Sequence, residues 1–212
     1  MSPDIRTPMN VIMGFTNIAL QHADDSDKMK ECLEKIRVSG SNLRELIDDV
    51  LDISRIESGE FKIVSQPVKL SELFDFYCQA IAGMAEAKNI RFSGKLHDIS
   101  HNVLLSDQIR LGQIYMNLLS NAVKYGRDGG HIEVRLKKDN GIVLSVKDDG
   151  IGIKEEDLPK IWGRFYRADE SRSRESGFGL GLSLVSQIAA LHGGKVSASS
   201  VYGEGSEFTV TF

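Results

Sequence analysis

Several residue types and patterns that mark particular protein classes are scarce in this chain of 212 residues. Its 2 cysteines, Cys32 and Cys78, are too few for a disulfide framework or a cysteine-rich metal site. With 4 prolines and no low-complexity run, it does not resemble a chain with a long disordered tail. No apolar run approaches the ~18 residues that span a bilayer, and Asp4 and Arg6 are untypical of a signal peptide. We therefore expect a reducing, cytoplasmic setting and no membrane contact by this segment.

Charge of one sign is also lacking, because the net charge is only −4 at pH 7. This value excludes a generally basic nucleic-acid-binding protein, and we expect no nucleic-acid partner. Residues 1–58 contain 7 Lys/Arg and 11 Asp/Glu, which leaves 19 of each sign for the rest of the chain. Two glycines precede residue 59 and 18 follow it. The composition therefore predicts a first domain at 1–58, a linker at 59–66 and a second domain at 67–212.

The first domain is predicted to be a pair of helices. Apolar residues recur every three or four positions over 9–20, and the polar cluster at 22–26 breaks this pattern, so that Asp25 or Ser26 caps the next helix. A heptad repeat follows at Met29, Leu33, Ile36, Gly40, Leu43, Ile47, Val50 and Ser54. Because this apolar stripe is wider than one hairpin can cover, we expect two copies to form a four-helix bundle. Packing against the second domain is the alternative.

The second domain alternates strand-like and helix-like stretches without a regular βαβ order. Strands are predicted at 61–64, 90–92, 103–105, 131–137, 142–147, 196–201 and 208–212. Helices are predicted over 71–85, 108–125 and 180–192, the first of them capped by Ser71. The fold class is therefore α+β: a helical hairpin followed by an α/β sandwich, whose mixed sheet carries helices on one face.

Three polar residues share one face of the predicted helix 108–125. Asn117 and Asn121 are one turn apart, and Lys124 follows three residues later. Two amide oxygens and an ammonium group can hold a hydrated Mg²⁺ ion and a polyphosphate. Taken alone, however, such a motif is more often a solvated helix face.

Three glycine-rich stretches follow this helix. Asp148 ends an apolar strand beside Gly150 and Gly152, where a carboxylate can accept a hydrogen bond from an exocyclic amine while the backbone approaches an aromatic ring. Residues 177–182 precede a helix, and their backbone N–H groups can cradle a phosphate. Their spacing matches neither the dinucleotide fingerprint nor a Walker motif. Residues 203–206 are typical of a tight turn between the last two strands.

Taken in order, these motifs resemble the ATP-binding domain of sensor histidine kinases, a branch of the ATPase superfamily shared with gyrase, Hsp90 and MutL. The asparagine motif resembles the N box. The other boxes are matched by 148–152 (first glycine box), 161–167 (phenylalanine box), 177–182 (second glycine box) and 203–206 (last glycine box). The resemblance extends over the whole chain and implies ATP and Mg²⁺ as ligands.

The resemblance implies a role for each matching residue. Asp148 would bind the adenine amine, Gly150 and Gly152 would let the backbone close on adenine, and Asn121 with Asn117 would hold Mg²⁺. The other nucleotide-binding residues would be Lys124 and Tyr125, beside the phosphates and ribose, together with Arg167, Gly177, Gly179, Leu180 and Gly181. Residues 165–176 would form a lid, whose arginines Arg167, Arg172 and Arg174 suit a triphosphate.

The hairpin resembles the family's dimerisation and phosphotransfer domain, whose signature reads Ser-His-Glu/Asp-Ile/Leu-Arg-Thr-Pro-Leu/Met. Residues 2–9 read Ser-Pro-Asp-Ile-Arg-Thr-Pro-Met, so Pro3 stands at the phosphoacceptor position and offers no nucleophile. Asp4 matches the general base, and Thr7 matches the residue used to dephosphorylate the partner. His22 does not replace the acceptor, since on one helix it lies ~28 Å from Pro3 and ~100° around the axis. An engineered change, a natural loss and a sequence error all remain open as origins of Pro3.

The resemblance implies that the chain is the catalytic core of a two-component sensor histidine kinase, acting as a homodimer. In that family the γ-phosphoryl group of Mg-ATP passes to a hairpin histidine and then to an aspartate of a response-regulator receiver domain. We expect this chain to lack autophosphorylation, and to be a fragment without its upstream helix and sensor. One alternative is a catalytically silent ATP-binding scaffold. An ATPase clamp of the gyrase or Hsp90 type is disfavoured, because those proteins carry Glu where Asn117 stands.

Overall fold

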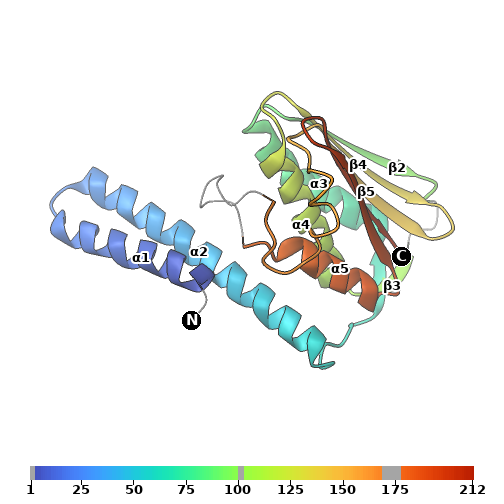
Figure 1. Cartoon of the computed structure of the whole chain (residues 1–212), viewed down its shortest axis with the longest axis horizontal. Coiled ribbons are helices and arrows are strands. Elements are labelled where there is room, and N and C mark those ends of the chain that lie inside the picture. The colour runs from blue at the N-terminus through green and yellow to red at the C-terminus, as the bar shows by residue number, and fades with distance from the viewer. Residues whose placement is uncertain (1–2, 100–102, 169–177) are drawn as a thin grey trace. The chain divides into compact units, whose positions relative to one another are not determined.

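The computed structural model describes residues 3–99, 103–168 and 178–212 (Figure 1). The chain divides into two compact units, Met1–Ser58 and Gly59–Phe212. Within the described residues, no helix has both the length and the apolar character that crossing a membrane requires.

The first unit is a helical hairpin of α1 (Pro3–Gln21) and α2 (Ser26–Glu57), which pack against each other. Asp25 caps α2, because its side chain accepts a hydrogen bond from the Lys28 backbone N–H at 3.0 Å. The helix ends at Glu57 with Ser58 as its C-cap residue, after which Gly59 takes a left-handed conformation with φ of +70°. The two predicted helices, the break between them and the cap are therefore confirmed.

The predicted heptad residues of α2 divide between two faces. Ile36 and Leu43 are half-buried, and Cys32, which lies next to the heptad residue Leu33, is 3% exposed. The neighbouring Leu33 is 56% exposed, and two further heptad residues, Ile47 and Val50, are also exposed. We call Leu33, Ile47 and Val50 the outer stripe. The hairpin by itself therefore covers only part of the predicted seam.

In the second unit, the elements in chain order are β1 (Gln66–Lys69), α3 (Leu70–Glu86), β2 (Arg91–His97), β3 (Val103–Ser106), α4 (Gln108–Tyr125), β4 (His131–Lys138), β5 (Ile142–Asp148), α5 (Gly181–Leu191), β6 (Lys195–Val201) and β7 (Gly205–Thr211). Among the residues that the structure describes, β1 and β3 form a small antiparallel sheet, and the others form a five-stranded sheet in the order β2-β4-β5-β7-β6. The pair β2–β4 is parallel and the other pairs are antiparallel. The sheet is mixed, as predicted.

The helices α3, α4 and α5 lie on one face of the large sheet (Figure 1). Alternate strand residues such as Val134 and Val146 are completely buried beneath them. Leu118 and Leu119 from α4 and Leu184 from α5 complete this core. The α+β sandwich predicted for this part of the chain is therefore confirmed.

One predicted strand is wrong. Residues 61–64 form no strand, and the pairing with β3 is made instead by β1, which begins at Gln66. Phe61 lies under the Arg110 guanidinium group, 4.3 Å from the ring centroid. The Val64 backbone N–H donates to Asp107 Oδ2 at 3.0 Å. These contacts hold residues 61–64 against the start of α4, so the segment is fixed without pairing as a strand.

The predicted helix cap at Ser71 is also wrong. Helix α3 begins one residue earlier, at Leu70, and its N-cap residue is Lys69, whose side chain makes no capping bond. The Lys69 ammonium group pairs instead with Glu72 at 2.7 Å. The buried Leu70 explains the earlier start, because it must lie on the helix face that packs on the core.

Candidate functional site

The asparagine motif lies on one face of α4, as the spacing predicts. Asn117, Asn121 and Lys124 are all half-buried, whereas Leu118 and Leu119 point into the core. Four-residue and three-residue steps on a helix place these three polar groups in one row. The core residues between them fix the direction in which that row faces.

Both ends of α4 are held by residues that lie outside the motifs identified from the sequence. The Asp107 carboxylate accepts from the backbone N–H groups of Ile109 and Arg110, at 3.1 and 3.2 Å. At the other end the Lys88 ammonium group donates to the carbonyl oxygens of Val123 and Lys124, each at 3.0 Å. A positive charge there also complements the helix dipole. An aspartate before a helical run is a capping signal that could have been read from the sequence, but the approach of Lys88 from another element could not.

The carboxylate of Asp148 lies at the end of β5 and is 6% exposed. Its Oδ1 accepts a hydrogen bond from the Gly150 backbone N–H at 2.9 Å. Burial raises the pKa of Asp148 above its ordinary value, although the backbone hydrogen bonds from Gly150 and Ser206 oppose the rise. A buried carboxylate in this position is a directional acceptor for an amine donor.

The first glycine box is packed tightly between α4 and β6. A Cβ on Gly150 would lie 2.3 Å from the carbonyl oxygen of Tyr125, to which the Ile151 N–H donates at 3.1 Å. Gly152 has a φ of +66°, and a Cβ there would lie 2.1 Å from the carbonyl oxygen of Val201. Neither position can carry a side chain without moving backbone, so the sequence motif reflects close approach of three chain segments.

The second glycine box meets the asparagine motif. A Cβ on Gly181, the first residue of α5, would lie 2.5 Å from Asn117 Oδ1. The preceding Leu180 is completely buried, which anchors the start of this helix. The N-terminal N–H groups of α5 therefore begin beside the half-buried amide of Asn117, and such a helix end favours anions.

Some of the predicted residues of this region lie outside the described residues. These are Gly177, Arg172 and Arg174, with most of the predicted lid at 165–176. Arg167 is described, and its positive charge opposes the rise that burial causes in the pKa of Tyr125. The Lys124 ammonium group lies 4.9 Å from the centroid of the Tyr125 ring. Tyr125 is thus close to two other predicted nucleotide-binding residues, Lys124 and Arg167.

The last glycine box supports the first one. The Gly203 N–H donates to the carbonyl oxygen of Ile151 at 2.8 Å. Ser200 lies outside the sequence motifs. Its hydroxyl group accepts a hydrogen bond from the Ile153 N–H at 2.8 Å and donates one to the carbonyl oxygen of Gly205 at 2.7 Å. A serine in a strand gives no signal of this role in the sequence. The turn at 203–206 is therefore part of the framework around Asp148.

The residues matched to the phosphotransfer signature belong to the first unit. Helix α1 begins at Pro3, where the missing N–H of proline costs no helical hydrogen bond. Asp4 follows within the same turn, and Thr7 is exposed. The nucleotide motifs all belong to the second unit.

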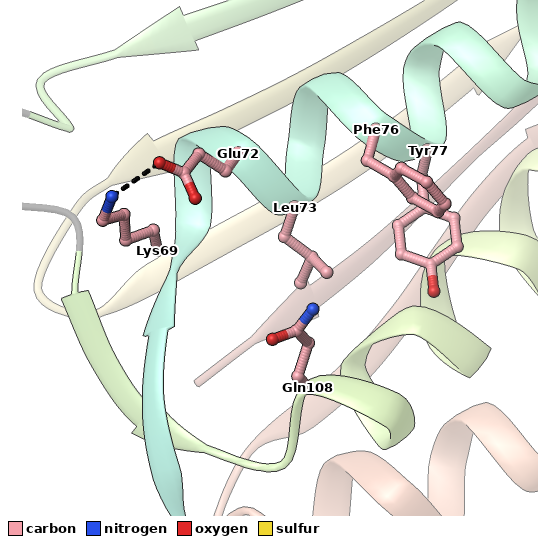
Figure 2. A pocket seen from close by; sticks show the side chains of 6 residues that line it. All are labelled: Lys69, Glu72, Leu73, Phe76, Tyr77 and Gln108. Atoms are coloured by element: carbon pink, nitrogen blue, oxygen red, sulfur yellow. Dashed lines mark hydrogen bonds and ion pairs between the residues drawn. The ribbon is translucent and has the colours of Figure 1, made fainter.

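A cavity of about 280 Å³ lies at the start of α3 and α4 (Figure 2). It is lined by Lys69, Glu72, Leu73, Phe76, Tyr77 and Gln108. None of the site residues predicted from the described part of the sequence lines this cavity. We therefore place the candidate site at the glycine boxes and the asparagine motif.

The donor set at this site fits a hydrated Mg²⁺ ion held together with phosphate. No group of three or more His, Cys, Asp or Glu residues that could hold a metal occurs among the residues described by the structure. Asn117 and Asn121 offer amide oxygens, which are hard ligands of the kind that Mg²⁺ accepts alongside water and phosphate. The close packing of Gly181 on Asn117 puts a helix N-terminus beside those oxygens.

Comparison with protein families identifies both units. Residues 106–212, more than half of the chain, match a family described as "Histidine kinase-, DNA gyrase B-, and HSP90-like ATPase". Residues 1–59 match the "His Kinase A (phospho-acceptor) domain". The chain belongs to the histidine kinase family. Its two units are those of a sensor histidine kinase catalytic core.

Individual histidine kinases are similar over the whole chain. The sensor protein GacS of Pseudomonas syringae pv. syringae is 34% identical over 217 residues, which cover 100% of this chain and 24% of GacS. The crystal structure of full-length ShkA in complex with AMPPNP has a TM-score of 0.77 and 26% identity, covering 97% of this chain and 42% of ShkA. A crystal structure of ThkA with the response regulator TrrA has a TM-score of 0.72 and 25% identity, covering 97% and 57%. The chain thus spans about a quarter of GacS and less than two thirds of ShkA or ThkA.

Proposed function

We propose that this chain is the ATP-binding core of a two-component sensor histidine kinase, and that the core itself cannot autophosphorylate. The observation that carries the first part is the packing of Gly181 on Asn117, which joins a helix N-terminus to a row of polar groups. The buried Asp148 begins the first glycine box, and its backbone packs against Gly205 of the last glycine box. Family membership and the AMPPNP complex of ShkA add support.

In this proposal the residues of the second unit position the nucleotide. Asp148 accepts a hydrogen bond from the exocyclic amine of adenine, and Gly150 and Gly152 let the backbone close on the ring. Lys124, Tyr125 and Arg167 lie beside ribose and phosphates, with Gly177, Gly179, Leu180 and Gly181 around the phosphates. Asn117 and Asn121 hold Mg²⁺, which when bound neutralises charge on the phosphates. Catalysis by such a site consists mainly of positioning and charge neutralisation.

The hairpin is proposed to dimerise through its outer stripe. Leu33, Ile47 and Val50 are exposed at heptad spacing on α2, and a second copy would bury them in a four-helix bundle. The complex of ThkA with TrrA supports a response-regulator receiver domain as the further partner. In the family such a core acts in the cytoplasm, and we propose the same setting here.

The second part of the proposal concerns Pro3. Phosphoryl transfer to the hairpin needs an imidazole nitrogen, and proline provides neither a nucleophile nor a proton for Asp4 to polarise. Thr7, at the position used for dephosphorylation of the regulator, is retained and exposed. The retained nucleotide motifs and the lost acceptor favour a core that binds ATP without transferring its phosphoryl group to itself.

Isothermal titration calorimetry tests the nucleotide site. We expect Mg-dependent binding of ATP, weakened by about 1–3 kcal/mol in Asp148→Asn through loss of a charge-assisted hydrogen bond. Asp139→Asn makes the same chemical change at an exposed turn and should leave the affinity unchanged. Equal affinities for the unmodified chain and Asp148→Asn would refute the adenine assignment.

Labelling with γ-phosphoryl-labelled ATP tests the acceptor. The unmodified chain and Pro3→Ala should gain no acid-labile phosphate, whereas Pro3→His should gain it on the introduced imidazole of the hairpin. Label on His22 of the unmodified chain would show that the acceptor was assigned wrongly. If Pro3→His binds ATP but gains no label, the second candidate function, a silent ATP-binding scaffold, is favoured instead.

A further inference from the structure

A buried carboxylate outside the family motifs holds the phenylalanine box. Asp157 follows the first glycine box and is 7% exposed. Its Oδ1 accepts a hydrogen bond from the Tyr166 hydroxyl group at 2.5 Å, and the Lys160 ammonium group lies 3.6 Å from the same oxygen. The hydrogen bond raises the pKa of Tyr166 to about 12. The bond joins residues that are nine positions apart in the chain.

The backbone that this bond holds is in an unusual conformation. Phe165, directly before Tyr166, has a φ of +57°, which residues other than glycine rarely adopt. The Tyr166 N–H donates to the carbonyl oxygen of Gly163 at 3.4 Å, which is a long hydrogen bond. The side-chain bond to Asp157 is therefore the stronger tie on this residue.

The same backbone forms the wall against which the second glycine box packs. A Cβ on Gly179 would lie 2.7 Å from the carbonyl oxygen of Tyr166 and 2.9 Å from the carbonyl carbon of Phe165. Two residues later, Gly181 packs on the Asn117 amide. A continuous series of close contacts thus runs from Asp157 through Tyr166 and Gly179 to Asn117.

We propose that the hydrogen bond between Tyr166 and Asp157 positions the second glycine box against Asn117. Tyr166 and Asp157 are then positioning residues for the phosphate side of the nucleotide. This inference rests on the proposed ATP site. Losing this bond removes the shorter of the two hydrogen bonds that hold Tyr166, which would allow Phe165 to relax to negative φ and so move the wall that supports Gly179. The adenine side is held separately, because Asp148 is fixed by the backbone of Gly150 and Ser206.

Because the phosphate side and the adenine side of the site are held separately, a local effect on the phosphate side can be distinguished from a general loss of structure. In Tyr166→Phe, which removes only the hydroxyl group, calorimetry with Mg²⁺ should show ATP binding about tenfold weaker, the ratio for one hydrogen bond. Adenosine, which has no phosphate, should bind within about twofold of its affinity for the unmodified chain, because no hydrogen bond is lost on the adenine side. Tyr77→Phe, at the cavity of α3, is the matched control and should change neither affinity.

Variants of the acceptor sharpen the test. Asp157→Leu should reproduce the loss of ATP affinity, and Asp157→Asn, whose amide oxygen still accepts the hydroxyl hydrogen, should recover part of it. Equal ATP affinity in Tyr166→Phe and the unmodified chain would overturn the proposal and leave the ATP site intact. Equal losses for ATP and adenosine would also overturn it, by indicating a general structural defect. If the unmodified chain binds no ATP, it is the proposed function that fails.

Discussion

The two units differ in how completely they bury their own apolar residues. In the hairpin, the α2 residues at heptad spacing lie partly toward α1, while Leu33 and Ile47 remain exposed. In the second unit, Leu118 and Ile188 are completely buried between the helices and the mixed sheet. A helix pair can form from local pattern alone, but it has no second layer to cover its outer side. The comparison teaches that the second unit has a closed core of its own, whereas the exposed heptad residues of the hairpin fit the partner copy proposed above.

The largest expected effect concerns that partner. In Ile47→Glu, a charge would enter the proposed dimer interface, and an unpaired buried charge costs several kcal/mol. Light scattering at micromolar concentration should therefore show a dimer for the unmodified chain and a monomer for the variant, with ATP affinity unchanged. Asn42→Glu, at an exposed polar position of α2, should remain dimeric. A monomeric unmodified chain would contradict the outer stripe as an interface.

The next effect tests the core of the second unit. Leu118→Ala should lower the free energy of unfolding by about 2–5 kcal/mol, because it removes packed methyl groups from a completely buried site. Ile109→Ala on the same helix removes a side chain that is 71% exposed and should cost far less. Urea denaturation of both variants measures the difference. Similar losses would show that the core does not carry the stability of this unit.

Helix caps in the two units should also differ. Asp107 is buried, accepts two N–H groups of α4 and also holds the Val64 N–H. Asp25 is exposed and accepts one N–H of α2. We expect Asp107→Ala to cost about 2 kcal/mol and Asp25→Ala about 0.5–1 kcal/mol, as measured by thermal unfolding. A larger loss at Asp25 would reverse the comparison.

The smallest effect is a pH dependence of nucleotide binding in the second unit. Burial holds the pKa of Asp148 above 3.8, so on acidification this carboxylate takes up its proton at a higher pH than a free aspartate. ATP affinity should therefore begin to fall on acidification at a higher pH than a free aspartate would give, because a carboxylate is the better acceptor. The folded state binds this proton more readily than the unfolded chain, so this group does not lower the free energy of unfolding as the pH falls. In Asp148→Asn, calorimetry should lose this component of the pH dependence.

Local patterns were sufficient for most elements and for the identity of the motifs. The heptad spacing predicted α2, the polar cluster before it offered Asp25 or Ser26 as its cap, and the spacing of Asn117, Asn121 and Lys124 placed them on one helix face. These features depend on residues within a few positions of one another, and helix periodicity expresses them directly. The same reasoning failed where contacts with residues far away in the sequence set the conformation of a segment. Residues 61–64 look like a strand, but Asp107 and Arg110 hold them in another conformation.

What the sequence by itself determined is therefore the hairpin, the α+β class and the order of the nucleotide motifs. Tertiary structure decided which side of α2 is covered, placing Cys32 inside and Leu33 outside. It also decided that Gly181 meets Asn117 and that Asp157 holds Tyr166. Such contacts join residues from separate segments, and their distances follow from how whole layers pack. No spacing within one segment encodes them, because the periodicity of a helix or strand fixes directions only along its own axis.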